Sequence, residues 1–422
     1  MEKKVNRVPR FVSAMIMVGM GGYLITWSYF RDALGQEFPA WSRSQLSLPF
    51  SLHNITVCMM MLFTGPLLAK LSGRVVLGFG GFAVLVGFGF FSFLPKDDPG
   101  LALVLATVGF GLIAAMSVGI GVIASFDTFL PWFPDRPGAI SGVLTFWCGV
   151  APILLGALCG AFIARFGVLT AISLLGAVIA AAVFVALIWS KKPGPDVKLP
   201  APPPKAEAAL GRDYSPAQIL RTGSFWCVFV FNVAIRSAGL IVSDLGGSIA
   251  VAIGVATIAG LMFAPANGLA CIVGGFLMDR FPMERVMTLM AGAAVIGGAA
   301  LCLGNVSHSS AAVITGIALV GFGYGGVTVT GVSGARVLFG MKHYAQNLGL
   351  ISVSIGPAAI AVILAGRLNT GGAGGYGGAF SLVTILGVVA LASCLAMFPA
   401  ERSRKAKLAK TAGSPPIRES AD

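Results

Sequence analysis

The chain has 422 residues, of which 56% are hydrophobic and only 11% charged, and its mean hydropathy is +0.89. A composition this apolar excludes a soluble domain and predicts a protein that crosses the membrane many times. The formal net charge of +13 comes from basic residues near the ends of apolar segments, a distribution that orients proteins in the membrane. The positive charge is therefore explained without a nucleic-acid partner, and we predict none.

Twelve apolar runs, each long enough to span a bilayer as a helix, follow one another along the chain. The first, 11–30, follows a basic segment but lacks a clear small-x-small cleavage site, so we expect it to remain in the mature protein. The other predicted spans are 46–68, 75–94, 101–131, 138–164, 168–190, 224–246, 249–278, 286–304, 310–338, 347–366 and 378–398.

The distribution of basic residues predicts the orientation. An even number of spans places both termini on one side of the membrane. If that side is the cytoplasm, it holds 23 of the 29 Lys and Arg residues, as expected for cytoplasmic segments. We therefore predict a multi-pass protein of the inner or plasma membrane with both termini cytoplasmic.

A polar, Pro-rich stretch at 191–223 separates the spans into two groups of six. Such a composition cannot bury a core, so we predict a cytoplasmic linker between an N-terminal bundle at 1–190 and a C-terminal bundle at 224–398. Residues 399–422 are basic and form a predicted cytoplasmic tail, held near anionic membrane lipid at most.

Two sequence landmarks recur in the second half of the chain. Ala69, at the end of the second span, corresponds to Asp279 at the end of the eighth, 210 residues later. The run Val108-Gly-Phe-Gly recurs as Val320-Gly-Phe-Gly, 212 residues later. The two offsets, 210 and 212 residues, nearly agree. This agreement predicts two six-helix units related by a pseudo-two-fold axis, with a substrate site between them near the midplane.

Arg236 lies near the middle of the span at 224–246. A guanidinium at that depth costs several kcal/mol, so it normally faces a bundle interior or an aqueous cavity. Its planar fork suits a carboxylate, which it can bind through two parallel hydrogen bonds. We predict that Arg236 contacts an anionic substrate. The alternative is an internal ion pair with Asp127 or Asp244.

The turn after the eighth span resembles the loop motif G-x-L-x-D-R-x-G-R of the major facilitator superfamily. At the corresponding turn in the first half of this chain, Ala69 occupies the position of the motif's aspartate. Within that superfamily, Trp27-Ser-Tyr-Phe30 and Trp132-Phe-Pro-Asp-Arg136 resemble the branch of monocarboxylate transporters and oxalate:formate antiporters. The resemblance implies an all-α membrane fold of twelve transmembrane helices in two pseudo-symmetric bundles. The residues that match the loop motif are Gly275, Leu277, Asp279 and Arg280, followed by Arg285.

The same resemblance implies two further site residues. The branch has an arginine four residues after an asparagine in its eighth helix, where this chain has Asn267 followed by Cys271. The lysine of the antiporter's eleventh helix corresponds to Ile355. Asn267 and Cys271 are therefore expected to line the central cavity, with Arg236 supplying the cation from another wall.

Several other polar residues inside spans are candidates for the site or for gating. His53 and Asn54 interrupt the second span, where a histidine can titrate in the physiological range or simply pack between helices. Tyr324 lies well inside the tenth span and is a candidate for the binding site or for aromatic packing. The candidates for proton coupling or gating are Asp127, Asp244, Asp279 and Arg280.

No catalytic or metal-binding constellation stands out, and the seven cysteines lie in apolar segments without metal-like spacing, so we predict neither an enzyme nor a bound cofactor or metal. The predicted function is secondary transport of a small organic anion, a mono- or dicarboxylate, by alternating access. Proton symport and anion exchange both remain open, and a monomer is expected. The alternatives are an efflux transporter of amphipathic compounds and a membrane sensor on a transporter fold.

Overall fold

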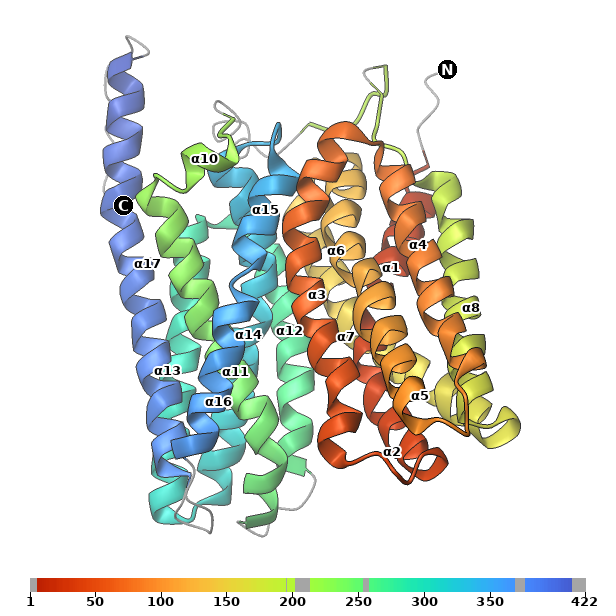
Figure 1. Ribbon diagram of the computed structural model, residues 1–422. Coiled ribbons are helices and arrows are strands. Elements are labelled where there is room, and N and C mark those ends of the chain that lie inside the picture. Colours follow the sequence, from red (N-terminus) through yellow and green to blue (C-terminus); the bar gives the residue numbers. More distant parts are fainter. Residues whose placement is uncertain (1–5, 195, 202–212, 253–257, 369–375, 412–422) are drawn as a thin grey trace.

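The computed structural model describes residues 6–194, 196–201, 213–252, 258–368 and 376–411, and the regular elements within these ranges are all helical. The helices form two bundles that stand side by side (Figure 1). The first bundle comprises α1 (Val8–Gly19), η1 (Met20–Thr26), α2 (Trp27–Glu37), α3 (Arg43–Lys70), α4 (Gly73–Gly89), η2 (Phe90–Phe93), α5 (Pro99–Ala106), η3 (Thr107–Ala114), α6 (Ala115–Phe129), η4 (Leu130–Trp132), α7 (Pro137–Phe166), α8 (Val168–Ala186) and η5 (Leu187–Trp189). The second comprises α10 (Pro216–Ile219), α11 (Gly223–Ala252), α12 (Ile258–Arg280), α13 (Met283–Ser307), α14 (Ser310–Phe339), α15 (Tyr344–Ser352), α16 (Ile355–Leu368) and α17 (Gly377–Thr411).

Eleven helical segments of the described residues are long and apolar enough to cross a membrane. Two predicted spans are broken: α1, the 3-10 segment η1 and α2 follow one another at 11–30, and at 347–366 α15 ends at Ser352 before α16 begins at Ile355. At Gly22, in η1, an added Cβ would lie 2.8 Å from Cδ of Pro152 in α7. This close approach requires a residue without a side chain. Counted with this broken first span, the structure agrees with the predicted fold of twelve helices in two bundles.

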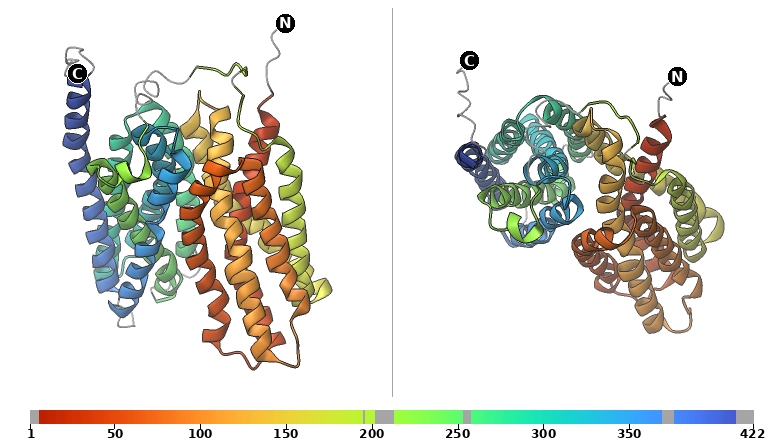
Figure 2. Two further views of the ribbon diagram at one scale, coloured as in Figure 1. Left: turned by 45° about the horizontal axis from the view of Figure 1, so that its top comes forward. Right: turned by 90° about the horizontal axis from the view of Figure 1, so that it is seen from above.

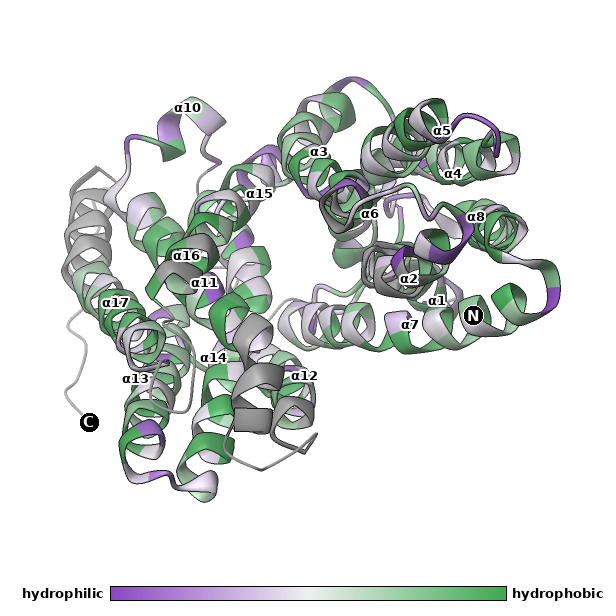
Figure 3. Cartoon of the chain, turned by 60° about the horizontal axis from the view of Figure 1, so that its bottom comes forward, coloured by the Kyte–Doolittle hydropathy of each residue, from purple (hydrophilic) through white to green (hydrophobic). Residues whose placement is uncertain are grey.

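Large apolar side chains cover much of the outside of the bundles. Phe79 and Phe82 of α4 are more than half exposed, as are Leu303 of α13 and Ile360 of α16. In Figure 3 the hydrophobic colour runs along the helices, and the hydrophilic colour lies mainly in the connecting turns. An apolar exterior of this kind is stable only in contact with lipid, because a soluble protein of this size does not expose such large apolar patches.

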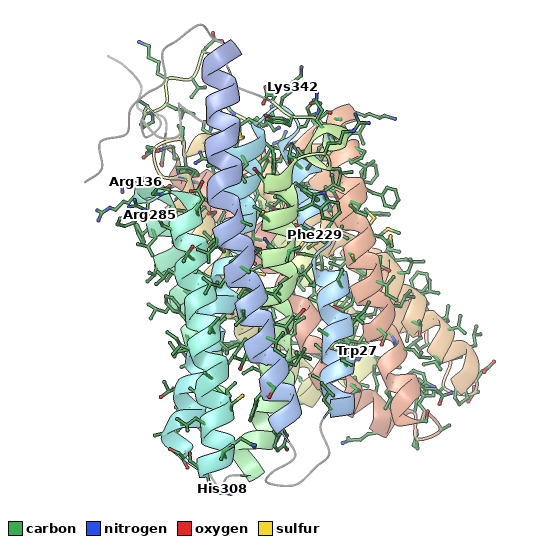
Figure 4. The ribbon with its side chains drawn as sticks, turned by 90° about the vertical axis from the view of Figure 1, so that its left-hand side faces the viewer. Trp27, Arg136, Phe229, Arg285, His308 and Lys342 are labelled. Carbon is green, nitrogen blue, oxygen red and sulfur yellow. The ribbon has the colours of Figure 1, made fainter. Side chains whose placement is uncertain are left out.

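One end of the molecule carries the two described ends of the linker, and we call it the linker side. Asp213 accepts a hydrogen bond from the amide of Lys342 at 2.9 Å, and the amide of Tyr214 donates to the Phe339 carbonyl at 3.0 Å. Figure 4 shows Lys342 near this end and His308 at the opposite end. The N-terminal end of α1 is on the linker side as well (Figure 1).

Candidate functional site

The two bundles meet on the linker side through two helix crossings, the first between α7 and α12. Gly142 of α7 faces the backbone of α12 so closely that an added Cβ would lie 2.3 Å from the Cys271 carbonyl oxygen and 3.1 Å from Cα of Gly275. At Gly275 an added Cβ would lie 2.5 Å from the Gly138 carbonyl oxygen. Glycine on both helices therefore allows the two backbones to touch.

Asp279, near the end of α12, bonds α12 to α7 at this crossing. Its two carboxylate oxygens accept hydrogen bonds from the backbone amides of Gly138 and Ala139, each at 2.8 Å. These amides belong to the first turn of α7, where helix N–H groups lack internal partners and the helix dipole favours negative charge. A carboxylate of the second bundle thus caps a helix of the first. The charge of Arg336, on α14, also acts on Asp279.

The second crossing joins α3 of the first bundle to α15 of the second. An added Cβ at Gly349 would lie 2.4 Å from the Met61 carbonyl oxygen, and one at Gly65 would lie 2.5 Å from Cα of Gln346. Figure 2 shows the two bundles from the linker side, where these crossings occur. The structure is therefore a state in which the bundles are closed against each other on the linker side.

Arg236 of α11 lies deep in the second bundle. Its Nε atom is buried without a hydrogen-bond partner, and the ion pairs of the described residues do not include it. The guanidinium interacts electrostatically with Tyr324 of α14. The Tyr324 ring packs against Gly239, one turn along α11, where an added Cβ would lie 2.2 Å from the ring. The predicted Arg236 and Tyr324 are thus brought together.

Asn267 and Cys271 lie on α12 beside the same part of α14. An added Cβ at Gly325, next to Tyr324, would lie 2.2 Å from the Asn267 carbonyl oxygen. The Cys271 thiol donates to the Gly325 carbonyl oxygen at 3.4 Å, and the side chain is only 3% exposed. In this state the thiol therefore points into the α12–α14 packing, which differs from the expectation that it lines the cavity.

His53 and Asn54 lie in the first bundle and make no described contact with Arg236. Nδ1 of His53 is 3.0 Å from the Phe110 carbonyl oxygen, and its ring packs against Tyr23 and Phe110. Its Nε2 atom is buried and lacks a partner among the described residues. The Asn54 side chain donates to the Phe50 carbonyl one turn back on α3. Both side chains therefore lie at backbone carbonyls of the first bundle in this state.

Asp127 forms an ion pair that the sequence did not indicate. Its carboxylate, 7% exposed, lies 2.7 Å from Nζ of Lys192 at the start of the linker. Arg74, at the start of α4, donates to the carbonyls of Leu187 and Ile188. The pairing of Arg236 with Asp127 is thus not present in this state, because a residue remote in sequence takes the carboxylate.

The structure shows fewer contacts for the two remaining gating candidates, Asp244 and Arg280. Asp244 belongs to α11, but its side chain lies outside the described residues. Arg280 is exposed at the end of α12, next to Asp279. Among the described residues there is no group of three or more His, Cys, Asp and Glu side chains that could hold a metal ion.

Sequence reasoning missed three contributors to the linker-side contacts: Lys192, Arg336 and Tyr344. The charge of Arg336 acts on both Asp279 and Tyr344, and that of Asp127 acts on Tyr344. The sequence shows Arg336 near the end of the tenth predicted span. Sequence reasoning treated it only as one of the cations that determine the orientation in the membrane. Its burial beside Asp279 requires the packing of α14 on α12.

Two membrane-spanning bundles that close against each other at one end, with a buried cation inside one of them, are the architecture of a membrane transporter. The chain belongs to the Major Facilitator Superfamily, whose family model matches residues 11–361. Membership in this superfamily of transporters agrees with the prediction that the chain is not an enzyme.

Two relatives are similar in sequence over most of the chain. The uncharacterized MFS-type transporter YhjX of Escherichia coli (strain K12) is 24% identical over 345 residues, which cover 80% of this chain and 82% of YhjX. The oxalate:formate antiporter of Oxalobacter formigenes is 24% identical over 406 residues, which cover 92% of this chain and 90% of the antiporter.

Solved structures show the same fold at low sequence identity. The proton:xylose symporter XylE superposes with a TM-score of 0.70 at 13% identity, covering 93% of this chain and 95% of XylE. The E. coli fucose:proton symporter FucP gives a TM-score of 0.67 at 14% identity, covering 92% and 98%. A bacterial homologue of the iron transporter ferroportin, in an outward-facing state, gives 0.68 at 14% identity, covering 94% and 99%.

Proposed function

We propose that this protein is a secondary transporter of a small organic anion, a mono- or dicarboxylate, and that Arg236 binds the anionic group. The observation that carries the proposal is the buried Nε atom of Arg236, which has no partner among the described residues. A guanidinium inside the membrane is costly unless an anion or water satisfies it. A transported carboxylate would satisfy the guanidinium whenever it is bound and would leave it again on release.

The neighbours of Arg236 support an organic anion with a small apolar body. Tyr324 offers a ring beside the guanidinium, and Phe263 packs against that ring at a centroid distance of 5.7 Å. Asn267 lies on the adjacent helix, and we propose that its amide assists binding. The similarity to an oxalate:formate antiporter is consistent with a carboxylate substrate.

Alternating access supplies the transport mechanism. The bundles are closed on the linker side, which we propose to be the cytoplasmic side, so the state described here would be open outward. Asp279 is proposed to break its bonds to α7 when the linker side opens, as a gate requires contacts that exist in one state and are absent in the other. Arg280, Asp127 and Asp244 remain candidates for gating or for proton coupling, and both symport and exchange fit this scheme.

The test is substrate binding and uptake by Arg236→Lys. Lysine keeps the charge but loses the planar two-point fork. Loss of a charge-assisted hydrogen bond of about 1.5–3 kcal/mol should weaken anion affinity about ten- to a hundredfold. Arg74→Lys is the matched control, because Arg74 donates only to the Leu187 and Ile188 carbonyls in the bonds described and should leave affinity unchanged.

Uptake of labelled monocarboxylates and dicarboxylates into proteoliposomes would identify the substrate. Near-normal affinity of Arg236→Lys for every transported anion would assign this arginine to the scaffold and refute the proposed site. Transport of amphipathic compounds without any carboxylate would favour an efflux transporter, for which the aromatic neighbours Phe263 and Tyr324 would form the site. Binding without uptake would favour a sensor.

A further inference from the structure

A histidine is enclosed in the first bundle at a depth similar to that of the proposed anion site in the second. His53 of α3 is completely buried, as are Tyr23 of η1 and Phe110 of η3, whose rings it contacts. In the internal repeat His53 corresponds to Phe263, 210 residues later, which packs against Tyr324 of the proposed anion site. His53 and Phe263 each lie seventeen residues before the linker-side end of their helix, so their depths in the membrane are similar.

The contacts of the imidazole determine which nitrogen carries its hydrogen. Nδ1 of His53 lies 3.0 Å from the carbonyl oxygen of Phe110. A carbonyl oxygen can only accept a hydrogen bond, so Nδ1 donates and carries the hydrogen. In the neutral ring Nε2 then has a free lone pair, and this atom is buried without a partner among the described residues. His53 therefore presents a basic nitrogen that is free to take up one proton.

The rings around His53 suit the charge that a proton would bring. The ring centroids of Tyr23 and Phe110 lie 5.6 Å and 4.7 Å from that of His53. Both are within the range of about 6 Å over which an aromatic face attracts a cation. Phe110 also belongs to the π-helical turn η3, a kind of turn that occurs frequently at functional sites.

The titratable side chain that packs against His53 in the contacts described is Tyr23, which is neutral near pH 7. The residues of η3 include no titratable side chain. On α6, Asp127 lies two residues before the linker-side end, and its carboxylate is paired with a lysine of the linker. On α2, Arg31 and Glu37 are exposed. The imidazole is thus the basic group of this buried cluster.

α3 connects the histidine to the contacts between the two bundles. Five residues after His53, the Cys58 thiol would lie 3.7 Å from a Cβ added at Gly356 of α16, and Gly65 approaches the backbone of α15 further along. When the bundles rearrange, α3 must therefore move relative to the second bundle or relative to η1 and η3. Because His53 is completely buried in this state, a movement of α3 away from η1 and η3 would give a proton access to it.

We propose that His53 is the proton-binding site of this protein and couples the transport of an anion to that of one proton. Nε2 takes up the proton from the solution on one side of the membrane and releases it on the other, while Nδ1 keeps its own hydrogen. The imidazolium charge favours the entry of an anion, because opposite charges attract strongly at low dielectric. The inference rests on the proposed anion transport and goes beyond it by naming the coupling ion and its residue.

The first experiment measures protonation directly, since the chain contains three histidines. His308 is exposed and has a left-handed backbone (φ 52°), which asparagine adopts readily, and the side chain of His343 makes no capping hydrogen bond. In the double variant His308→Asn/His343→Asn, nitrogen-15 NMR of the remaining imidazole reports its protonation and tautomer without any substrate. We expect the Nδ1–H form at about pH 8 and the imidazolium at about pH 5. An imidazole that stays neutral over this range would overturn the proposal.

The second experiment measures coupling in proteoliposomes with labelled oxalate and lactate. The pH gradient is about one unit, the membrane potential is held at zero, and uptake by protein-free liposomes is subtracted. His53→Asn keeps a donor near the position of Nδ1 for the Phe110 carbonyl but cannot bind a proton. His308→Asn is the matched control, because it makes the same substitution at the end of the molecule opposite the linker side (Figure 4).

The parent chain and His308→Asn should accumulate a transported anion up to about tenfold, because a gradient of one pH unit supplies a factor of ten for each coupled proton. His53→Asn should equilibrate the anion without accumulating it and should retain exchange of labelled for unlabelled anion. A purely structural role of the histidine predicts accumulation by His53→Asn as well, since the bond to Phe110 is retained.

Accumulation by His53→Asn equal to that of the parent would therefore overturn the proposal, as would a parent chain that exchanges anions without responding to the pH gradient. Both results would leave the proposed anion transport standing. If His53 takes up a proton but no variant transports either carboxylate, the proposed substrate class is refuted and the proton site stands. If His53→Asn fails to fold, the NMR titration and the response of the parent chain to the pH gradient decide the proposal.

Discussion

Gly142→Ala should prevent full closure of the linker side while leaving each bundle folded. The added Cβ would lie 2.3 Å from the Cys271 carbonyl oxygen and 3.1 Å from Cα of Gly275, whereas ordinary contacts are 3.4–4 Å. Both obstacles are backbone atoms, so no change of rotamer relieves the clash. The α7 and α12 backbones must move apart by about 1 Å.

The size of the effect follows from the cost of overpacking, which is about 1–3 kcal/mol for one added methyl group in a packed interface. At about 1.4 kcal/mol per factor of ten, the open-to-closed ratio should rise about 5- to 150-fold. Under the proposed alternating access the two helices separate when the linker side opens, so the cost falls on the closed state alone. Stability within each bundle should change little.

The assay is a distance measurement between spin labels at Val8→Cys and Arg221→Cys, exposed positions on different bundles, in a cysteine-free background, together with thermal unfolding in detergent. Gly149→Ala is the matched control, because it adds the same methyl group to the same helix at a position with nothing within 4 Å. If Gly142→Ala gave the same distance distribution as Gly149→Ala, the close crossing of α7 and α12 would not control closure and the reasoning would be wrong.

Three further predictions concern buried or paired groups. The Cys271 thiol, 3% exposed and bonded to a carbonyl, should react with a small aqueous maleimide far more slowly than an exposed engineered cysteine, and rapid labelling in the linker-side-closed state would contradict its orientation. Lys192→Gln should lower the free energy of unfolding by about 1 kcal/mol, because it leaves the Asp127 carboxylate without its cation. Adding Asp127→Asn to that variant should restore the unfolding temperature measured in detergent. Partial burial raises the pKa of Asp135, but the hydrogen bond and charge of Arg7 and the charge of Arg136 outweigh it and hold that pKa below its ordinary value of 3.8. The stabilising contribution of Asp135 should therefore be complete well above pH 3.8 and disappear as the pH falls below it, so thermal unfolding of Asp135→Asn and the parent chain should converge only in acid.

Much of the fold could be predicted from the sequence because its signals are local. A run of about 20 apolar residues is a membrane helix wherever it occurs in the chain, since the bilayer core leaves backbone groups no other partners. The agreement between the two landmark offsets indicated the two bundles. The first and eleventh spans departed from the expectation of one continuous helix each, and in the first span the close packing of Gly22 on Pro152 depends on a residue 130 positions away.

The candidate site was predicted in part. The position of Arg236 near the middle of its span follows from the sequence alone. Its proximity to Tyr324 depends on how α11 packs against α14. The orientation of the Cys271 thiol depends in the same way on α12 and α14, and a rotation of one helix by a fraction of a turn would have changed it.

The sequence by itself determined the membrane class and the twelve-helix fold, and it predicted the duplicated halves and the depth of Arg236, because each depends on composition and periodicity along the chain. Only the tertiary structure decided which charges meet. Asp127 pairs with Lys192, and Asp279 bonds to a helix of the other bundle. The physical reason is that hydrogen bonds and ion pairs act over about 3 Å, so their partners are fixed by the relative rotation and translation of helices that no single segment encodes.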